Sequence, residues 1–413
     1  MTMFSGFNYG GTFPTQRSMA LVPFLTLTTS GPKIVPIEFT PLESAATSAA
    51  NVFWKAITVG YGAPADYAIH WLLNGAALNP PQMNDLKRLA HARATAISRA
   101  YACTVLPSGA AALVPRDIYS LIESTERTGT SYLMGCTVAA LCAPEAIKWQ
   151  LGGSPTGIDY LFHASLLKAA TKAGMPVVVN SKGQGSIDFL GFDTQFHLHV
   201  IEAKGSGGAI SYQQIGGGLD QCDDVVDITL APGIDVAPRT KSVSAAYVDA
   251  NAVNCMGLPV GHCVRAVVIG LPLAAASTQP APAAPVAREK VLRESVARLL
   301  ALQAIGAWAF VTATTSASKS SGDWARFRFV PDTDIAEPVH LAMRKTIVEM
   351  VEASYQRMRG QVANARPRRH AQDMLKVTLT DLGIDLMRAM SDTPVAPDGL
   401  SFSGADPWVA VQM

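Results

Sequence analysis

The sequence predicts an α/β fold in which an αβββαβ core with a mixed sheet lies between a largely helical N-terminal region and a helical C-terminal region. Two observations support this prediction. Between residues 151 and 272, a helical pattern is followed by several apolar runs of strand length, and long amphipathic patterns lie on both sides of this segment. Hydrophobic residues make up 49% of the chain, which is enough for a large buried core.

The N-terminal region spans residues 1–150. Up to about residue 60, short apolar runs between Gly and Pro predict loops and strands. The run Met19 to Leu27 follows Arg17 but contains Pro23 and lacks a small-residue cleavage site, so we expect a strand rather than a signal peptide. From about Ala65 to Ile147 the apolar spacing becomes helical.

The predicted core spans residues 151–272 and opens on the sequence GGSPTG. Its first element is a helix over residues 157–174, because Ile158, Leu161 and Phe162 share a stripe with Leu166 and Ala169. The GGG run at 216–218 predicts a loop or a broken helix, since each glycine costs about 1 kcal/mol relative to alanine. The remaining predicted elements are a buried strand at 176–180, a hairpin at 185–205, a helical segment at 210–222, and strands at 224–230 and 263–271.

A Pro/Ala-rich stretch at residues 273–287 predicts a linker. The C-terminal region, residues 288–413, contains two amphipathic patterns that predict helices over 288–305 and 338–360.

The overall charge excludes a global attraction to nucleic acid or anionic membranes, because 33 basic and 32 acidic residues leave a formal net charge of +1. The six cysteines show neither a CxxC pair nor a Cys/His ligand spacing, as expected of small buried residues in a reducing compartment. No apolar stretch approaches the roughly 18 residues of a membrane span. We therefore expect a cytoplasmic protein without a membrane partner, while export by a route without a signal peptide stays open.

The predicted hairpin carries charges in an otherwise apolar context. Side chains alternate along a strand, so Glu202 and Lys204 emerge on the same face as Val200. If the hairpin turns at Gln195, Asp188 lies directly opposite Glu202, with their Cβ atoms about 5 Å apart.

Two carboxylates at that distance need a compensating cation. Asp188, Glu202 and the backbone carbonyl of Ala203 together offer the oxygen ligands that a hard divalent cation prefers. We expect Mg²⁺, with Mn²⁺ as a substitute. Such an ion polarises a phosphoryl oxygen and activates water, while Lys204 orients that water or takes up its proton.

The tripeptide alone does not establish this site. Asp85-Leu86-Lys87 has the same spacing in a helical pattern with no acidic partner on a neighbouring strand. The alternative for Asp188, Glu202 and Lys204 is an exposed edge hairpin with a cross-strand ion pair. The apolar residues around them favour instead a strand buried on both faces.

The stretches SIDFLGF and IEAKG resemble the PD-(D/E)xK nuclease superfamily, which has the restriction-endonuclease-like fold, over about residues 155–230. The resemblance implies a metal-dependent nuclease in which Asp188 and Glu202 bind the metal and Lys204 assists the attack on the phosphodiester. It also implies a glutamine on the following helix, for which Gln213 and Gln214 are candidates. One departure is Ile187, where the motif has proline.

The family frequently adds an acid from the first helix. Asp159 is the nearest candidate, but Thr156 and Asp159 also form a capping-box pattern. Glu123 and Glu126 are further candidates, although their spacing is also typical of a solvated helix face. His197 and His199 flank the turn, and we interpret them as surface or core-edge residues because His199 faces away from Glu202.

The leading functional hypothesis is a Mg²⁺-dependent endonuclease that hydrolyses DNA, most naturally double-stranded DNA, in restriction or phage defence. A secreted nuclease toxin restrained by an immunity protein, and a non-catalytic DNA-binding protein with the same fold, are the alternatives. A homodimer and a defence-system partner are also left open. Candidate phosphate-binding residues are Arg239, Lys241, Arg357, Arg359, Arg366, Arg368 and Arg369.

Overall fold

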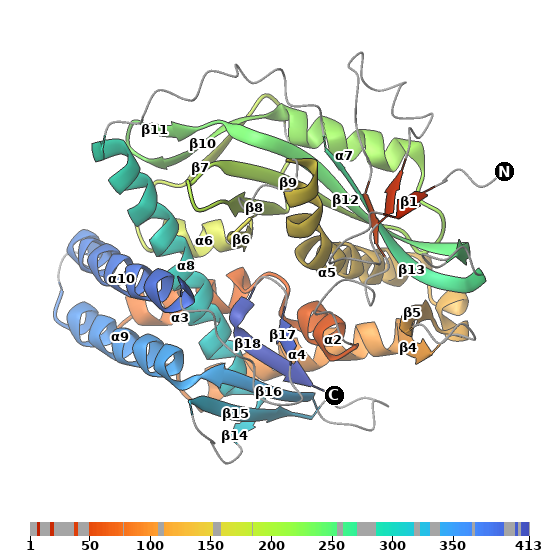
Figure 1. Cartoon of the computed structure of the whole chain (residues 1–413). Helices are drawn as coiled ribbons and strands as arrows, with labels where there is room; N and C mark the ends of the chain where they lie inside the picture. Colours follow the sequence, from red (N-terminus) through yellow and green to blue (C-terminus); the bar gives the residue numbers. More distant parts are fainter. Residues whose placement is uncertain are drawn as a thin grey trace.

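The computed structural model, shown in Figure 1, describes most of the chain from residue 49 onward and three short strands before it. The described residues are 6–8, 17–19, 37–39, 49–76, 78–105, 111–151, 158–183, 185–253, 259–270, 286–317, 323–330, 339–365, 368–391, 401–403 and 406–412. Most of the stretch from Met19 to Leu27 and of the predicted linker at 273–287 lies outside this set, although β2 ends at Met19 and α8 begins at Val286.

An eight-stranded mixed sheet forms the centre of the protein. Neighbouring strands run antiparallel except β12, which runs parallel to β9. The mixed α/β architecture is therefore confirmed. In spatial order the strands are β1 (Gly6–Asn8), β2 (Arg17–Met19), β3 (Ile37–Phe39), β13 (Pro259–Gly270), β12 (Pro238–Val253), β9 (Leu198–Gly205), β8 (Phe189–Phe192) and β6 (Tyr160–His163).

The β8–β9 hairpin has the predicted register. Phe189 lies opposite Ile201 and Phe192 lies opposite Leu198, so the next position along the hairpin sets Asp188 against Glu202. All four residues of β8 and the first six of β9 are buried, and β6 and β12 flank the pair on either side. The alternative of an exposed edge hairpin is therefore wrong.

Two helices cover opposite faces of this part of the sheet. Ile201 and Ala203 pack in one apolar cluster with residues of α5 (Ser124–Gln150). Val200 belongs to a second cluster, which includes Ile215 of α7 (Tyr212–Asp224). Among the strands of this sheet and the two helices that cover it, the chain order is α5, β6, β8, β9, α7 and β12; α6 and β7 lie between β6 and β8, and β10 and β11 lie between α7 and β12.

The predicted helix over 157–174 is wrong in its first half. Residues Tyr160–His163 form β6, which pairs with β8, and only Leu166–Lys172 form a short helix, α6. Phe162 and Leu161 are buried on opposite faces of the strand, and this pairing outweighs the helical spacing of their neighbours. The boundary predicted near residue 150 falls between α5 and β6.

A separate three-stranded sheet contains two of the predicted strands. β7 (Val178–Ser181) and β11 (Ile234–Val236) flank β10 (Val225–Ala231). The 176–180 segment is thus a strand, but the prediction that it is buried is wrong, because Val178 is 51% exposed and the rest of β7 is half-buried.

The GGG run lies inside the continuous helix α7, so the predicted loop or break is wrong. Ser211 caps the helix through a capping box with Gln214. A Cβ atom on Gly218 would lie 3.0 Å from a methyl group of Val243 and 3.1 Å from Cε of Lys204. Glycine at this position lets α7 approach the sheet closely enough to contact Lys204.

A second close approach holds α5 against the end of β9. A Cβ atom on Gly205 would lie 1.8 Å from the carbonyl oxygen of Ser131, and one on Gly135 would lie 2.8 Å from the Lys204 backbone. Helix and strand backbones therefore touch directly beside Glu202 and Lys204.

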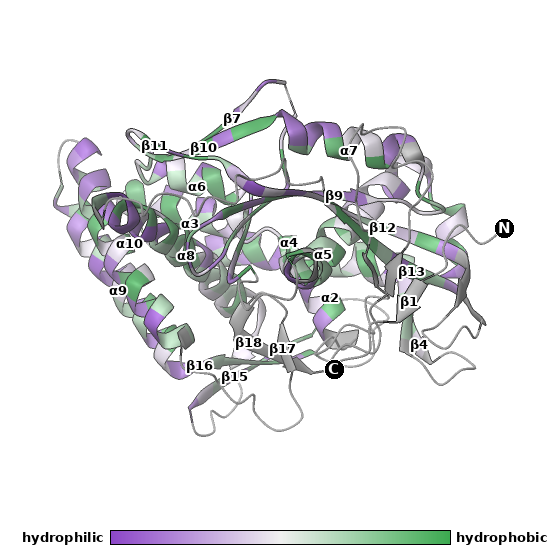
Figure 2. Ribbon diagram, turned by 45° about the horizontal axis from the view of Figure 1, so that its top comes forward, coloured by the Kyte–Doolittle hydropathy of each residue, from purple (hydrophilic) through white to green (hydrophobic). Residues whose placement is uncertain are grey.

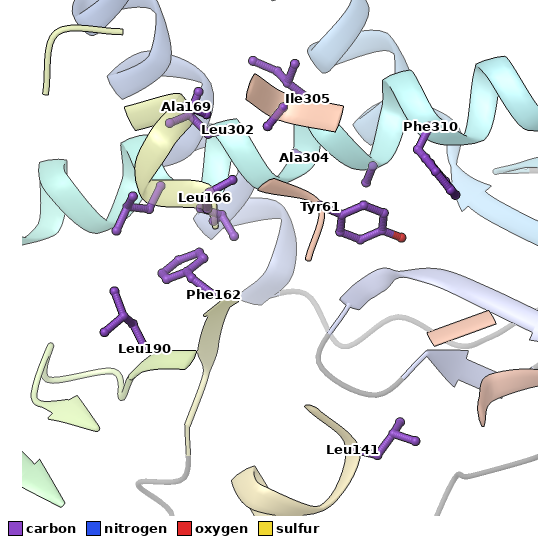
Figure 3. Packing of buried hydrophobic residues seen from close by; sticks show 14 of the residues in the cluster. Tyr61, Leu141, Phe162, Leu166, Ala169, Leu190, Leu302, Ala304, Ile305 and Phe310 are labelled. Atoms are coloured by element: carbon purple, nitrogen blue, oxygen red, sulfur yellow. The ribbon is translucent and has the colours of Figure 1, made fainter. Parts of the chain in front are cut away.

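The other side of the molecule is a helical layer built around α8 (Val286–Thr314). α8 packs against α6 and against four longer helices. Leu302, Ala304 and Ile305 of α8, labelled in Figure 3, belong to the same buried cluster as Leu166 of α6 and as Phe162 and Leu190 of the sheet. The partners are α3 (Gly62–Leu73), α4 (Pro80–Ala100), α9 (Lys345–Ala363) and α10 (Arg368–Ser391); α2 (Ala49–Thr58) packs on α4 and α5.

α8 is long and apolar enough by length and composition to cross a membrane, contrary to the expectation from the sequence. However, 72% of its most apolar 18-residue window is buried inside the protein, as in the core helix of a soluble protein. By contrast, α9 and α10 carry hydrophilic and hydrophobic residues together (Figure 2), as helices that pack on one side do.

The C-terminal region is not purely helical, which corrects the prediction. The expected helix over 338–360 begins only at Lys345, because Val339–Arg344 form β16. A small hairpin and a short 3-10 helix likewise interrupt the N-terminal helices. The C-terminal strands form one sheet in the spatial order β14 (Ser316–Ala317), β15 (Trp324–Phe329), β16, β18 (Asp406–Gln412) and β17 (Ser401–Ser403). The N-terminal hairpin consists of β4 (Tyr101–Val105) and β5 (Ala111–Pro115), and the 3-10 helix η1 (Asp117–Leu121) follows it.

Glycine-to-alanine substitutions test this packing. Gly205→Ala is expected to lower the free energy of unfolding by at least about 2 kcal/mol, because the added methyl group meets the Ser131 carbonyl. Gly217→Ala, whose methyl group meets nothing within 4 Å, is expected to raise it by about 1 kcal/mol. Urea unfolding followed by circular dichroism measures both, and an equal effect of the two substitutions would contradict the packing described.

Candidate active site

The candidate site lies directly before β8 begins, where β9 extends beyond β8 and stays paired only with β12. Asp188, directly before β8, accepts a hydrogen bond at Oδ2 from the backbone N–H of Ala203 at 2.9 Å. Its Oδ1 accepts one from the hydroxyl of Tyr132 on α5 at 3.0 Å. The side chain is thus fixed between the strand and the helix, close to Glu202.

Glu202 is 4% exposed. Its Oε1 accepts a hydrogen bond from Nζ of Lys204 at 2.6 Å, whereas its buried Oε2 has no hydrogen-bond partner among the described residues. A buried carboxylate oxygen without a partner is costly. A cation or a proton at this position would remove that cost.

The pKa of Glu202 also reflects its burial beside a second carboxylate. Burial, followed by the negative charge of Asp188, raises the pKa of Glu202 to about 7, although Lys204 acts in the opposite direction. Two carboxylates and one ammonium leave one uncompensated negative charge, and Glu202 meets this by holding a proton near neutral pH.

Lys204 is held by a second partner that the sequence analysis missed. Its Nζ donates to Oε1 of Gln221 on α7 as well as to Glu202. Gln213 is exposed, and the side chain of Gln214 caps the helix, so neither of these predicted glutamines is the one that contacts Lys204. Gln221 lies seven residues after Gln214, two turns along the same helix face. A loop or break at the GGG run would have removed this helical relation, so the sequence alone did not indicate Gln221.

The backbone of Ala203 supports its predicted contribution. The N–H and C=O of one strand residue point to the same edge, and the N–H of Ala203 points to Asp188. Its carbonyl oxygen therefore faces the same edge, beside the two carboxylates. Asp188, Glu202 and Ala203 offer an oxygen-rich donor set that suits Mg²⁺ or Mn²⁺.

Two further side chains of types that can bind a metal lie beside Asp188. One ligand atom each of Cys136, His163 and Asp188 lies within 4.8 Å of the other two. Cys136 comes from α5 and His163 from β6. Their separation along the chain gives no spacing signal, so sequence reasoning could not have linked them.

The acids considered from the first helix lie apart from these contacts. Glu123 and Glu126 are exposed, in agreement with a solvated helix face. Asp159 is not a helix cap, because it directly precedes β6; its N–H donates to the Phe192 carbonyl, and burial raises the pKa of its carboxyl to about 6.

The two histidines at the hairpin turn belong to a buried charge cluster at the other end of β9. The Asp193 side chain is fully buried and accepts hydrogen bonds from the His197 ring and from Arg239. Burial opposes ionisation, but hydrogen bonds from the ring and backbone N–H of His197, with the His199 ring 3.8 Å away, hold the pKa of Asp193 well below its usual range. His199 is buried, not at the surface, and its Nδ1 is 2.8 Å from the Thr240 hydroxyl.

The predicted phosphate-binding residues are dispersed. Arg239 is engaged with Asp193, about 16 Å along the strand from Lys204. Lys241 donates to the carbonyl and carboxylate oxygens of Asp223 on α7. The helices α9 and α10 carry Arg357, Arg359, Arg368 and Arg369, all exposed, on the side of the molecule away from α7 (Figures 1 and 2); Arg366 lies outside the described residues.

Comparisons with protein-family models, with curated proteins and with solved structures give no match to this chain. The geometry of the site therefore carries the functional argument.

The raised pKa of Glu202 predicts a specific pH dependence of stability. The folded protein holds the Glu202 proton up to about pH 7, but the unfolded chain releases it near the ordinary value of 4.5. The stabilisation is thus fully present below about pH 4.5 and is lost as the pH rises through 7. In chelator, we expect wild type to lose about 1–3 kcal/mol more than Glu202→Gln between pH 5 and pH 8.

Urea unfolding at both pH values measures this difference. Glu126→Gln, on an exposed residue, serves as the control and is expected to follow wild type. Identical pH profiles for wild type and Glu202→Gln would rule out a protonated Glu202.

Proposed function

We propose that this protein is a Mg²⁺-dependent nuclease that hydrolyses phosphodiester bonds of nucleic acid, with double-stranded DNA as its substrate. The observation that carries the proposal is the convergence of Asp188, Glu202 and Lys204, with the buried Oε2 of Glu202 left without a partner. This arrangement combines a site for a hard cation with an ammonium group next to it.

The order of the elements supports the same proposal. Among the elements that form or cover the mixed sheet, α5, β6, β8, β9, α7 and β12 occur in the αβββαβ order that the PD-(D/E)xK resemblance implies, with α6, β7, β10 and β11 inserted between them. Asp188 directly precedes the second strand of this order, and Glu202 and Lys204 lie on the third, in the sequence that the resemblance implies.

Each residue has a distinct proposed role. Asp188, Glu202 and the Ala203 carbonyl would hold the cation, which supplies Lewis-acid polarisation of the scissile phosphate. Lys204 would orient the attacking water and take up or stabilise its proton. Gln221 and Glu202 together fix the position of the Lys204 ammonium group. Tyr132 fixes one oxygen of Asp188.

The proposed biological setting is restriction or phage defence in the cytoplasm. A toxin that an immunity protein neutralises would use the same site, and the two settings differ in whether the chain leaves the cell. The exposed arginines of α9 and α10 offer sequence-independent phosphate contacts, although they lie away from the site.

A plasmid-cleavage assay tests the activity. Wild type with Mg²⁺ or Mn²⁺ is expected to nick or cut DNA, and Lys204→Ala or Asp188→Ala is expected to lower the rate by at least about 100-fold. Lys87→Ala is the matched control, because Asp85-Leu86-Lys87 repeats the tripeptide spacing in helix α4, and it is expected to retain the wild-type rate.

Equal cleavage by wild type and both site variants would reject the catalytic assignment. Salt-sensitive DNA binding without any metal-dependent product would instead identify a non-catalytic DNA-binding protein. Thermal melts of all variants confirm that each one is folded.

The glutamine contact gives a second test within the same assay. Gln221→Ala is expected to lower the cleavage rate about tenfold with little change in KM, because it frees Lys204 without touching the acids. Gln213→Ala, on an exposed residue of the same helix, is expected to have no effect. A larger loss with Gln213→Ala than with Gln221→Ala would contradict the assignment of Gln221.

A further inference from the structure

A mixed set of ligand side chains meets on the α5 side of the sheet. Cys136 lies on α5, His163 is the last residue of β6, and Asp188 precedes β8. One ligand atom of each lies within 4.8 Å of the other two. Because three separate elements supply these side chains, their convergence is a property of the tertiary fold rather than of one loop.

The site is enclosed but not sealed. Cys136 is 1% exposed, while His163 and Asp188 are half-buried. His163 also lines a cavity of about 30 Å³ together with Val59, Gly60 and Phe189. That volume holds about one water molecule, and because neither Cys136 nor Asp188 lines the cavity, it lies beside the imidazole ring rather than between the three ligands.

We propose that Cys136, His163 and Asp188 form a binding site for a soft divalent cation, zinc above all, that shares Asp188 with the proposed magnesium site. Thiolate and imidazole ligands select zinc over magnesium, whereas the oxygen set of Asp188, Glu202 and Ala203 has the opposite preference. Three protein ligands leave the fourth tetrahedral position to water.

The hydrogen bonds around His163 are compatible with this role. Nδ1 lies 2.8 Å from the Ser165 hydroxyl, which leaves Nε2 as the nitrogen available to a metal. Ligation through Nε2 requires a hydrogen on Nδ1, and the hydroxyl oxygen is placed to accept it. The contact of the Ser165 N–H with Nδ1 at 3.1 Å is given up in exchange.

Ligation also requires the Cys136 thiolate, so binding of zinc releases the thiol proton to solvent. Burial and the negative charge of Asp188 raise the pKa of the Cys136 thiol well above its usual range, so the bound cation itself must stabilise the thiolate. Arg93, whose guanidinium donates to the carbonyl oxygens of Ile57 and Val59, acts in the opposite direction. Its positive charge favours the thiolate.

The shared carboxylate makes the two sites compete. Asp188 is held by Tyr132 and by the Ala203 N–H in its present position, between the thiol on one side and Glu202 on the other. Once Asp188 ligates zinc, it contributes less negative charge to the oxygen-lined site. Zinc is therefore expected to act as an inhibitor of the proposed nuclease, and this consequence alone rests on the proposed function.

Cobalt(II) binding to the full chain tests the site without any assay of activity. Cobalt replaces zinc in such sites and gives an intense thiolate charge-transfer absorption. Wild type is expected to show this absorption and Cys136→Ser to lack it. The matched control Cys142→Ser, a buried cysteine on the same helix outside the cluster, is expected to retain it.

Absence of the absorption in wild type, or its persistence in Cys136→Ser, would overturn the proposal. If Cys136→Ser does not fold, His163→Gln serves as the second variant, and we expect zinc affinity measured by calorimetry to fall about 10- to 100-fold. An unchanged affinity in His163→Gln would equally overturn it.

Two further measurements separate this inference from the proposed nuclease. Glu202→Gln is expected to lose magnesium binding and to keep the cobalt absorption, because Glu202 is not part of the zinc cluster. If DNA cleavage is observed, the zinc concentration that halves it is expected to rise at least about tenfold in Cys136→Ser. Cobalt absorption without any DNA cleavage would retain the metal site and reject only the nuclease.

Discussion

The local structure of the site depends on the hydrogen bond from the Ala203 N–H to the Asp188 carboxylate. The β8–β9 ladder ends at the pair Phe189 and Ile201, and beyond it the side chain of Asp188 takes the place of a strand neighbour. This satisfies a buried backbone donor and at the same time fixes a carboxylate opposite Glu202. Without it, the end of β9 would have an unpaired edge and the two acids would have no fixed relation.

The close helix contacts follow from the same requirement. A strand that extends beyond its neighbour must be covered, and α5 covers β9 at Gly205 and Gly135 while α7 covers the opposite face at Gly218. The helices that make these contacts also carry side chains of the candidate site. α5 supplies Tyr132 and Cys136, and α7 supplies Gln221, so the helices that exclude water from β9 also complete the surroundings of Asp188 and Lys204.

The local part of this site was predictable from the sequence. The alternation of Val200, Glu202 and Lys204, together with a turn at Gln195, determines both the strand face and the register, because these depend only on the period of a β-strand. Predictions failed where tertiary packing decides. Tyr160–His163 has a helical spacing yet pairs with β8, and Gly218 fits inside helix α7 because the helix packs tightly on Val243 there.

The non-local residues could not have been found in this way. Gln221 requires α7 to be continuous, and Cys136 and His163 require α5 and β6 to meet beside Asp188. No fixed spacing links these residues along the chain. The sequence did not predict the C-terminal strand β16 for a related reason, because β16 runs directly into α9 and one amphipathic pattern covers both elements.

The charges around Asp188 give a physical reason why the two proposed cation sites would depend on each other. Asp188 and Glu202 exceed Lys204 by one negative charge, and a proton on Glu202 balances it near neutral pH. A divalent cation in the oxygen-lined site displaces that proton, so its affinity should rise as Glu202 ionises. A cation on the thiol side draws on Asp188 instead and lowers the repulsion that keeps Glu202 protonated. On the two proposed sites, a proton, a hard cation and a soft cation would each compensate the same excess negative charge, and binding of any one would alter the affinity for the other two.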